Sequence, residues 1–552
     1  MLYFCKDKFG QRATHRRTVV SLFTVLYRRQ GHQLTAKMVF DRMRCFFFLL
    51  RIIIAGFICL GTHLHARQPN VILFLIDDLG WADLGLTGST FYETPNVDTL
   101  AAEGVFFSDA YAANPVCSPT RASILTGKYP SRIGLTNHSG YAGAQGPQYR
   151  LKPAAVVGYM PPEDTTLAEA LQAAGYITAH FGKWHLQAHN DQSRTHYPQA
   201  NGFDLNIAGH RGGHPNSFYF PYKGESHPAY DVPDMEDGQD GDYLTDALTD
   251  KVIQFIEGNQ ASPFFVNFWF YTVHTPIHGR KDKVEKYRAK AKELDLTPET
   301  RPDAVADHQS FSMARQDNPH YAAMVESMDD NIGRVLDALE RLGLEENTIV
   351  IFLSDNGGLS TGSGTASPTS SFPLRAGKGW VYEGGIRTPL IVKYPKGIPA
   401  GLTLTEPAIS TDLYPTILDL IGAPLMPAQH VDGISLKPLF HDSSGAVERE
   451  AIYFHYPHYH HINSMGPAGA VRAGDYKLVE RFETGEVELY NLSEDLGEQT
   501  DLSKAMPELT EKLRGMLHIW QRSSGAQMPV VNTKYDAACE DFQSQCTTLR
   551  AL

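Results

Sequence analysis

Short apolar runs alternate with longer helical patterns through most of this chain. Three of the runs are almost wholly apolar, at 71–76, 263–271 and 348–353, and a less apolar run lies at 176–181. Apolar runs of this length are typical of strands buried on both faces of a parallel sheet. Over 321–343 the apolar positions recur every three or four residues, which predicts a helix. Strands that alternate with helices predict an α/β fold, with a large, mostly parallel sheet flanked by helices.

The pattern changes after about residue 440. Runs at 451–454, 476–479 and 487–490 predict antiparallel strands, and the spacing over 507–522 predicts a closing helix. We therefore expect two domains in the body of the chain. The predicted division is 67–440 for the large domain and 441–552 for a smaller C-terminal α+β subdomain.

The first 66 residues differ from the rest in charge. They hold 11 Lys and Arg against 2 Asp and Glu, which leaves a net charge of −22 for the rest of a chain whose total is −13. Arg42 and Arg44 precede the apolar run 45–60, and the small residue Ala66 follows. This pattern predicts that 1–66 is a signal peptide with an upstream extension before Met38. The mature protein would be exported, periplasmic or secreted, without stable membrane insertion; an uncleaved anchor is the alternative.

The acidic body of the chain limits the partners that it can bind. A protein that binds nucleic acid presents a basic surface to the phosphates, and a body with a net charge of −22 does not. We therefore expect no nucleic-acid partner. If the ligand is an anion, the positive charge that attracts it must be local.

Polar side chains follow each of the predicted strands. They are Asp77 and Asp78 after the first run, Lys183 and His185 after the run at 176–181, His274 after the run at 263–271, and Asp355 and Asn356 after the run at 348–353. Because ligands bind beyond the carboxyl ends of parallel strands, we expect these side chains to share one edge of the sheet. The Asp and Asn oxygens suit a hard cation, Ca²⁺ or Mg²⁺, better than zinc.

One cysteine has no evident partner in the sequence. Cys539 and Cys546 are close enough to close a small disulfide loop, and three of the six cysteines lie in the leader, which leaves Cys117 alone. Pro119 suits the first turn of a helix, so we expect Cys117 just before a helix N-terminus and Arg121 about one turn further on. Unpaired amides at such a position favour an oxyanion.

The sequence 117–127, Cys-Ser-Pro-Thr-Arg followed by Ala-Ser-Ile-Leu-Thr-Gly, resembles the signature of type I (formylglycine-dependent) sulfatases in the alkaline phosphatase superfamily. The second signature of that family matches 175–185, and the blocks at 77–78, 355–357 and 376–387 follow in the family's order. The resemblance spans about residues 69 to 520, with no departure at a catalytic position. It implies an alkaline-phosphatase-like fold, with a catalytic sulfatase domain at 67–440.

The resemblance also implies a role for each matched residue. The metal ligands would be Asp77, Asp78, Asp355 and Asn356 together with Cys117, and the ion would be Ca²⁺, with Mg²⁺ as the alternative. The catalytic residues would be Cys117, Arg121, Lys183, His185, His274 and Lys378. A separate maturation enzyme would convert Cys117 to formylglycine (3-oxoalanine).

The implied reaction is hydrolysis of a sulfuric ester, of the arylsulfatase type. One hydroxyl of the hydrated aldehyde would attack sulfur, while His274 or Lys378 assists the departing alcohol. His185 would deprotonate the other hydroxyl, which then expels sulfate. Arg121 and Lys183 would brace the formylglycine and the sulfate, and with the divalent ion they would neutralise the sulfuryl group.

Two histidine-rich clusters are candidates for substrate contact. The first holds His210, Arg211 and His214, and the second holds His455, His458, His460 and His461. Among these we predict sugar contacts for His210, Arg211, His214, His458 and His460. A histidine-rich stretch also occurs as a weak metal site or a solvated loop.

A local positive pocket in an acidic body favours one terminal sulfated sugar, attacked from the end of a chain, over a long polyanion. Galactose and N-acetylgalactosamine sulfates are our expectation within this class, and a small aryl sulfate would also enter. Two other functions stay open at this point. One is a phosphate or phosphonate ester hydrolase of the same superfamily, and the other is an inactive protein that binds sulfated glycans.

Overall fold

The computed structural model describes residues 46, 67–224, 227–296, 304–307, 310–362, 367–441, 447–460 and 465–539. From Gln68 onward the described residues belong to one compact unit. The predicted leader lies outside the described residues except for Phe46, and so do His461 and Cys546. Among the described helices, none has the length and apolar character needed to span a bilayer.

An eight-stranded sheet forms the centre of this unit, in the order β13-β2-β12-β10-β1-β7-β5-β6. The strands are β1 (Asn70–Ile76), β2 (Val105–Phe107), β5 (Ile177–Gly182), β6 (Leu205–Ile207), β7 (Phe264–Trp269), β10 (Thr348–Ser354), β12 (Leu390–Lys393) and β13 (Leu402–Leu404). The neighbours from β10 to β6 pair in parallel, whereas β12 runs antiparallel to β10 and β2. The prediction of a mostly parallel sheet is confirmed.

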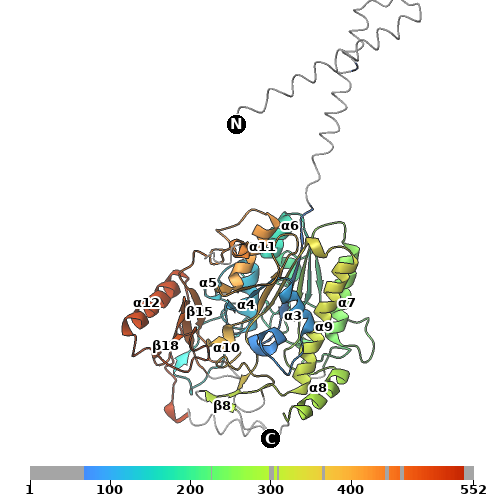
Figure 1. Ribbon diagram of the computed structural model, residues 1–552. Coiled ribbons are helices and arrows are strands. Elements are labelled where there is room, and N and C mark those ends of the chain that lie inside the picture. Colours follow the sequence, from blue (N-terminus) through green and yellow to red (C-terminus); the bar gives the residue numbers. More distant parts are fainter. Residues whose placement is uncertain are drawn as a thin grey trace, which may run out of the picture. The chain divides into compact units, whose positions relative to one another are not determined.

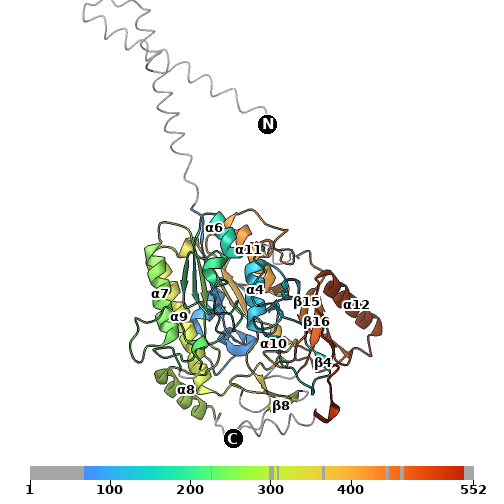
Figure 2. The same ribbon diagram turned by 180° about the vertical axis from the view of Figure 1, so that it is seen from behind.

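Alternate residues of β1 enter two different cores. Ile72 and Phe74 pack with α3 (Pro95–Ala102), α7 (Leu244–Gly258), α8 (Lys281–Glu293) and α9 (Pro319–Arg341) on one face. Leu73 and Leu75 pack on the other face with α4 (Cys117–Thr126), α6 (Leu167–Ala173) and α11 (Leu413–Ile421). Figures 1 and 2 show these two helical layers from opposite sides. Because both faces are covered, the strand reads as a continuous apolar run.

The predicted helix at 321–343 is α9, which begins two residues earlier. The Asn318 side chain caps it by accepting from the amides of His320 and Tyr321, and Pro319 occupies the first turn. Gly343 follows the helix with a φ of 65°, a left-handed conformation that glycine adopts without strain.

A second sheet stands beside the large one. It holds β15 (Ile452–Tyr456), β16 (Ala468–Ala473), β17 (Tyr476–Arg481) and β18 (Val487–Asn491), all antiparallel in this order, and α12 (Pro507–Ser523) packs on it. The predicted runs 476–479, 487–490 and 507–522 lie within β17, β18 and α12, and the run 451–454 begins one residue before β15. Their apolar cluster also includes residues of the segment before α10 (Glu383–Ile386), so the second sheet packs on a part of the chain that belongs to the large domain in the predicted division.

The remaining described elements are small. They are α5 (Pro130–Ile133), the pairs β3 (Ala110–Tyr111) with β14 (Ala408–Ile409) and β4 (Leu151–Lys152) with β19 (Val530–Val531), and the three-stranded sheet β8 (Ala304–Asp307), β9 (Ser310–Met313) and β11 (Thr361–Gly362). The predicted boundary between residues 440 and 441 stays a prediction.

Buried charges join the second sheet to α10. The Lys477 ammonium on β17 lies 2.8 Å from a carboxylate oxygen of Glu383 and 2.8 Å from one of Glu498, and all three side chains are fully buried. Burial would raise the pKa of Glu383, but Lys477 and Arg387 outweigh it and hold that pKa at about 2. Burial raises the pKa of Glu498 to about 7, so Lys477 balances mainly the charge of Glu383.

We expect Lys477→Met to lower the free energy of unfolding by about 3–5 kcal/mol. Buried Glu383 would keep Arg387, at 3.2 Å, as its remaining ion-pair partner among the described residues, and buried Glu498 would lose its ion pair. Arg481→Met is the matched control on the same strand, since the one ion pair of Arg481 within the described residues is with Glu486, at 3.6 Å, whose side chain is 66% exposed. It should cost less than about 1 kcal/mol. Urea unfolding of both variants measures the difference. Equal losses of unfolding free energy would contradict a stabilising role for the buried joint, which is the contact of Lys477 with Glu383 and Glu498.

Candidate active site

Four adjacent strands of the large sheet end at the same edge. Their order is β10-β1-β7-β5, all parallel, so the residues after them converge. Asp77 and Asp78 follow β1, and Asp355 follows β10. Asp78 (φ 62°) and His185 (φ 57°) both take the left-handed backbone conformation, which side chains other than glycine adopt at a cost. Each of these residues turns the chain sharply just after its strand.

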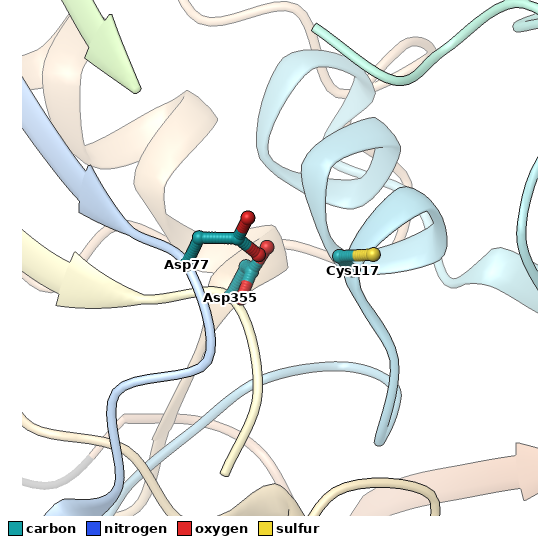
Figure 3. Close-up of side chains that lie close together, drawn as sticks. All are labelled: Asp77, Cys117 and Asp355. Atoms are coloured by element: carbon teal, nitrogen blue, oxygen red, sulfur yellow. The ribbon is translucent and has the colours of Figure 1, made fainter. Parts of the chain in front are cut away.

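Two strand ends and one helix start supply the centre of the site. Asp77, Cys117 and Asp355 each offer one ligand atom within 4.8 Å of the other two. Figure 3 shows these side chains on the chain that follows β1 and β10 and on the first turn of α4. A second group of this kind, Asp77, Asp78 and His274, satisfies the same limit. The predicted metal ligands with ionisable groups are therefore brought together.

Three buried cations balance the three buried carboxylates. The Lys183 ammonium lies 2.8 and 2.7 Å from the two oxygens of Asp77, and the Lys378 ammonium lies 2.6 and 2.7 Å from those of Asp78. Arg121 donates to Asp355 Oδ2 from Nε at 2.9 Å and from Nη2 at 2.6 Å. A bound divalent cation would therefore leave the site with a net positive charge, which suits an anionic ester.

Asn356 has an oxygen to spare in this site. Its amide nitrogen donates to Asp78 Oδ1 at 2.8 Å and to the Gly357 carbonyl at 2.9 Å. Its carbonyl oxygen is buried and accepts no hydrogen bond within the described residues. A buried acceptor without a donor is costly, and a hard cation satisfies it. The residues present thus fit an oxygen-liganded divalent ion.

Cys117 is the first residue of α4 rather than the residue before it. Its sulfur is buried and lies 3.3 Å from His185 Nδ1. Burial would raise the pKa of the thiol, but the charges of Lys183 and Lys378 hold it well below its usual range. Burial lowers the pKa of His185 to about 3, so its imidazole is neutral at neutral pH. A negatively charged group at residue 117 is therefore stabilised at the start of α4.

Arg121 donates to Asp355 inside the protein and has no exposed surface. It is fully buried, it donates from Nη1 to the Lys183 carbonyl at 3.1 Å, and its guanidinium lies 5.1 Å from the centre of the Trp269 ring. The backbone of Lys378 is fixed by a hydrogen bond, in which its amide donates at 2.9 Å to the carbonyl of Gly358, a residue just beyond β10. Both cations are therefore fixed before any ligand arrives.

The first histidine cluster divides between the interior and the site. His214 is half-buried and stacks on His274, with ring centres 5.7 Å apart and planes at 8°. His210 is buried and its Nδ1 lies 2.9 Å from the Tyr271 hydroxyl. Arg211 is half-buried and donates to the Asp191 carbonyl at 3.2 Å. Of these three, His214 lies against a predicted catalytic side chain.

The second cluster is mostly internal. His458 is fully buried, and its two ring nitrogens lie 2.8 Å from the Thr136 hydroxyl and 2.9 Å from the Ala142 carbonyl. His455 is also buried, with Nε2 3.0 Å from the Gln527 carbonyl. In this arrangement both ring nitrogens of His458 are already engaged within the protein.

The sequence interpretation missed one histidine of the site. His138 is half-buried and stacks on His185, with ring centres 5.5 Å apart, and its ring centre lies 6.0 Å from that of His460. It lies in none of the family blocks and follows no predicted strand; the sequence 137–139 matches only a glycosylation sequon, which does not indicate an active-site histidine. Through His138 the second cluster approaches the site at His460.

Buried carboxylates and cations at the carboxyl edge of a mostly parallel sheet, around a buried cysteine at a helix start, are typical of an enzyme with an α/β fold that hydrolyses anionic esters. The family model "Sulfatase" matches residues 69–423, and "N-sulphoglucosamine sulphohydrolase, C-terminal" matches 376–522. The chain belongs to the sulfatase family of the alkaline phosphatase superfamily, and it is a sulfuric ester hydrolase.

Known relatives cover most of the chain. A sulfatase of Formosa agariphila is 34% identical over 82% of this chain and 89% of its own length. The N-acetylgalactosamine-6-sulfatase of Canis lupus familiaris is 32% identical over 69% of this chain and 67% of its own length. The crystal structure of Ps i-CgsB is 28% identical, with a TM-score of 0.67, and covers 87% of this chain and 98% of that one.

The contacts of His458 lead to a prediction about its role. We expect His458→Ala to lower the free energy of unfolding by about 1–3 kcal/mol, because it leaves two buried polar partners unsatisfied. Turnover of a sugar sulfate and of an aryl sulfate should then fall in the same proportion. His189→Ala, at an exposed histidine, should leave the unfolding free energy unchanged. Full stability of His458→Ala with a loss confined to the sugar sulfate would instead support the predicted sugar contact.

Proposed function

We propose that this protein releases sulfate from sulfated carbohydrates, with a formylglycine made from Cys117 as the nucleophile and one bound divalent cation. The observation that carries the proposal is the cluster around Cys117, in which three buried carboxylates are matched by three buried cations. Such a cluster with a divalent ion added attracts an anion without help from the acidic surface.

Asp77, Asp78, Asp355 and Asn356, with the modified Cys117, would hold the cation. All the protein side chains in this set offer oxygen, which favours Ca²⁺, with Mg²⁺ as the alternative. When bound, the ion would act as a Lewis acid toward a sulfate oxygen. The formylglycine, once made by a maturation enzyme, would supply a hydroxyl nucleophile in its hydrated form.

The chain's own residues would bind the sulfate and move its protons. Lys183 and Lys378 would turn part of their hydrogen bonding from Asp77 and Asp78 to the sulfate oxygens. His185, neutral and 3.3 Å from the residue 117 side chain, is placed to take a proton from its hydroxyl. Either His274 or Lys378 would give a proton to the departing sugar oxygen. His274 lies 3.5 Å from Asp78, so both candidates face the same carboxylate.

The relatives support a sugar as the substrate. N-acetylgalactosamine-6-sulfatases are 30–32% identical to this chain, and Ps i-CgsB was solved in complex with k-i-k-neocarrahexaose. We therefore keep galactose and N-acetylgalactosamine sulfates as the first compounds to test, with attack at the chain end. His214 and His138 line the approach to the site from two sides. Export of the mature protein, after cleavage of 1–66, belongs to the same proposal.

A panel of defined sulfated mono- and oligosaccharides, with released sulfate as the readout, tests the function. The sulfate and phosphate esters of one aryl alcohol belong in the same panel. Faster turnover of the phosphate ester would favour the phosphatase alternative. Binding of a sulfated sugar by matured protein without any sulfate release would favour the inactive glycan-binding alternative.

We expect mass spectrometry of the peptide containing residue 117 to show an aldehyde in place of the thiol. Cys117→Ala should then lower turnover by about a thousand-fold or more, because the nucleophile is gone. Cys539→Ala is the matched control, since that thiol lies far along the chain in a half-buried position. Undiminished turnover by Cys117→Ala would show that the nucleophile lies elsewhere.

Removal of the cation should abolish turnover. We expect a chelator to stop sulfate release, and Ca²⁺ to restore it better than Mg²⁺. Asp355→Asn should bind less metal by elemental analysis and should not recover. Asp432→Asn is a matched control, because Asp432 also pairs with an arginine, Arg132, at 2.7 Å but belongs to no candidate metal group among the described residues. It should recover with added metal. Turnover that survives the chelator would overturn the assigned ligand set.

A further inference from the structure

A row of aromatic rings runs from His274 toward the surface. His214 stacks on His274, and Tyr230 stacks on His214 with ring centres 4.0 Å apart and planes at 23°. The next ring is His189, whose centre lies 4.9 Å from that of Tyr230. His214 and Tyr230 are half-buried, and His189 is exposed. The row therefore begins at the reacting groups and ends in solvent.

Backbone contacts hold this row in place. The Asn216 amide donates to the Tyr230 carbonyl at 3.0 Å, and the Asn216 side chain donates to Asp231 at 2.7 Å. Gly213 packs so closely on the His185 ring that a Cβ there would lie 2.7 Å from it. The segment that carries His214 is thus tied to the site at one end and to Tyr230 at the other, so the rings are preorganised.

Arg211 adds a positive charge beside the row. Its guanidinium donates to the Asp191 carbonyl, in the turn that carries His189. The pKa of His189 is lowered, first by burial and then by the charge of Arg211. In the described part of the chain no carboxylate pairs with Arg211, and its Nε is buried without a hydrogen-bond partner. The Asp191 carboxylate interacts with Arg211 only at longer range, so an anion beside His189 would meet a cation without a close ion-pair partner among the described residues.

We propose that Tyr230 and His189, with Arg211 at their side, form a subsite for the sugar next to the sulfated one, and that this subsite favours a neighbour carrying a carboxylate or a sulfate. The inference rests on the proposed carbohydrate sulfatase function. A sugar whose sulfate group lies at the buried carboxylates would contact His274 and His214. The neighbouring sugar of the same chain would then lie beside Tyr230 and His189. Half-exposed aromatic side chains with a few polar groups are a usual lining for such a sugar.

The test compares kcat/KM for the sulfated monosaccharide turned over fastest in the panel with that for disaccharides that extend it by a neutral, a uronate or a sulfated neighbour. In the wild-type protein we expect the disaccharide to be preferred, most strongly with an anionic neighbour. Tyr230→Ala should lower the disaccharide-to-monosaccharide ratio by about five-fold to ten-fold. Tyr230→Phe should keep the ratio, because the ring remains.

Arg211→Met should lower the ratio only for the uronate and sulfated neighbours, and a drop for one of the two alone identifies which anion the subsite takes. If Tyr230→Ala fails to fold, Tyr230→Leu keeps the bulk and lacks the ring, so it should show the same drop. Tyr394→Ala is the control, since Tyr394 follows β12 at the opposite edge of the sheet and should change neither rate.

An unchanged ratio in an active Tyr230→Ala or Tyr230→Leu variant would overturn the subsite. Equal losses for neutral and anionic neighbours in Arg211→Met would overturn its preference for an anion. Absence of sulfate release from every compound by the matured wild-type protein would instead overturn the proposed function, and the subsite with it.

Discussion

The pairing of buried carboxylates with buried cations at the carboxyl edge of the sheet governs the architecture around it. Asp77, Asp78 and Asp355 lie where water cannot solvate them, and each would be strongly destabilising without a partner. Lys183, Lys378 and Arg121 reach them from different parts of the chain, with contacts between 2.6 and 2.9 Å. Two of the cations that let these carboxylates be buried, Lys183 and Lys378, are the ones that we propose for binding the sulfate.

This pairing also connects the site to the second sheet, which supplies none of the three carboxylates. Lys378 lies on the segment that leads into α10, and α10 is joined to β17 through Glu383 and Lys477. The apolar cluster of the second sheet includes that segment. A disturbance of the joint would therefore reach the site through the position of Lys378.

Around the charged centre the walls are aromatic and mostly uncharged. His138 covers His185 on one side, and the row from His214 to Tyr230 continues from His274 on the other. Burial lowers the pKa of His185 and of His214, which keeps these imidazoles neutral near pH 7. The positive charge of the site is thus concentrated on Lys183, Lys378 and Arg121, which pair with the carboxylates. The surrounding aromatic side chains are suited to contact with sugar rings.

The sequence by itself determined the parallel strands and the chemistry at their ends. The runs at 71–76 and 348–353 were readable because strands covered on both faces must be apolar throughout, and the order of strand and helix placed their ends together. The antiparallel β12 has four residues, too short a pattern to assign, and only pairing with β10 and β2 sets its direction. Tertiary packing alone decided that His458 is internal, that His138 stacks on His185 and that Tyr230 stacks on His214, because these positions depend on contacts between segments that are separated in the chain.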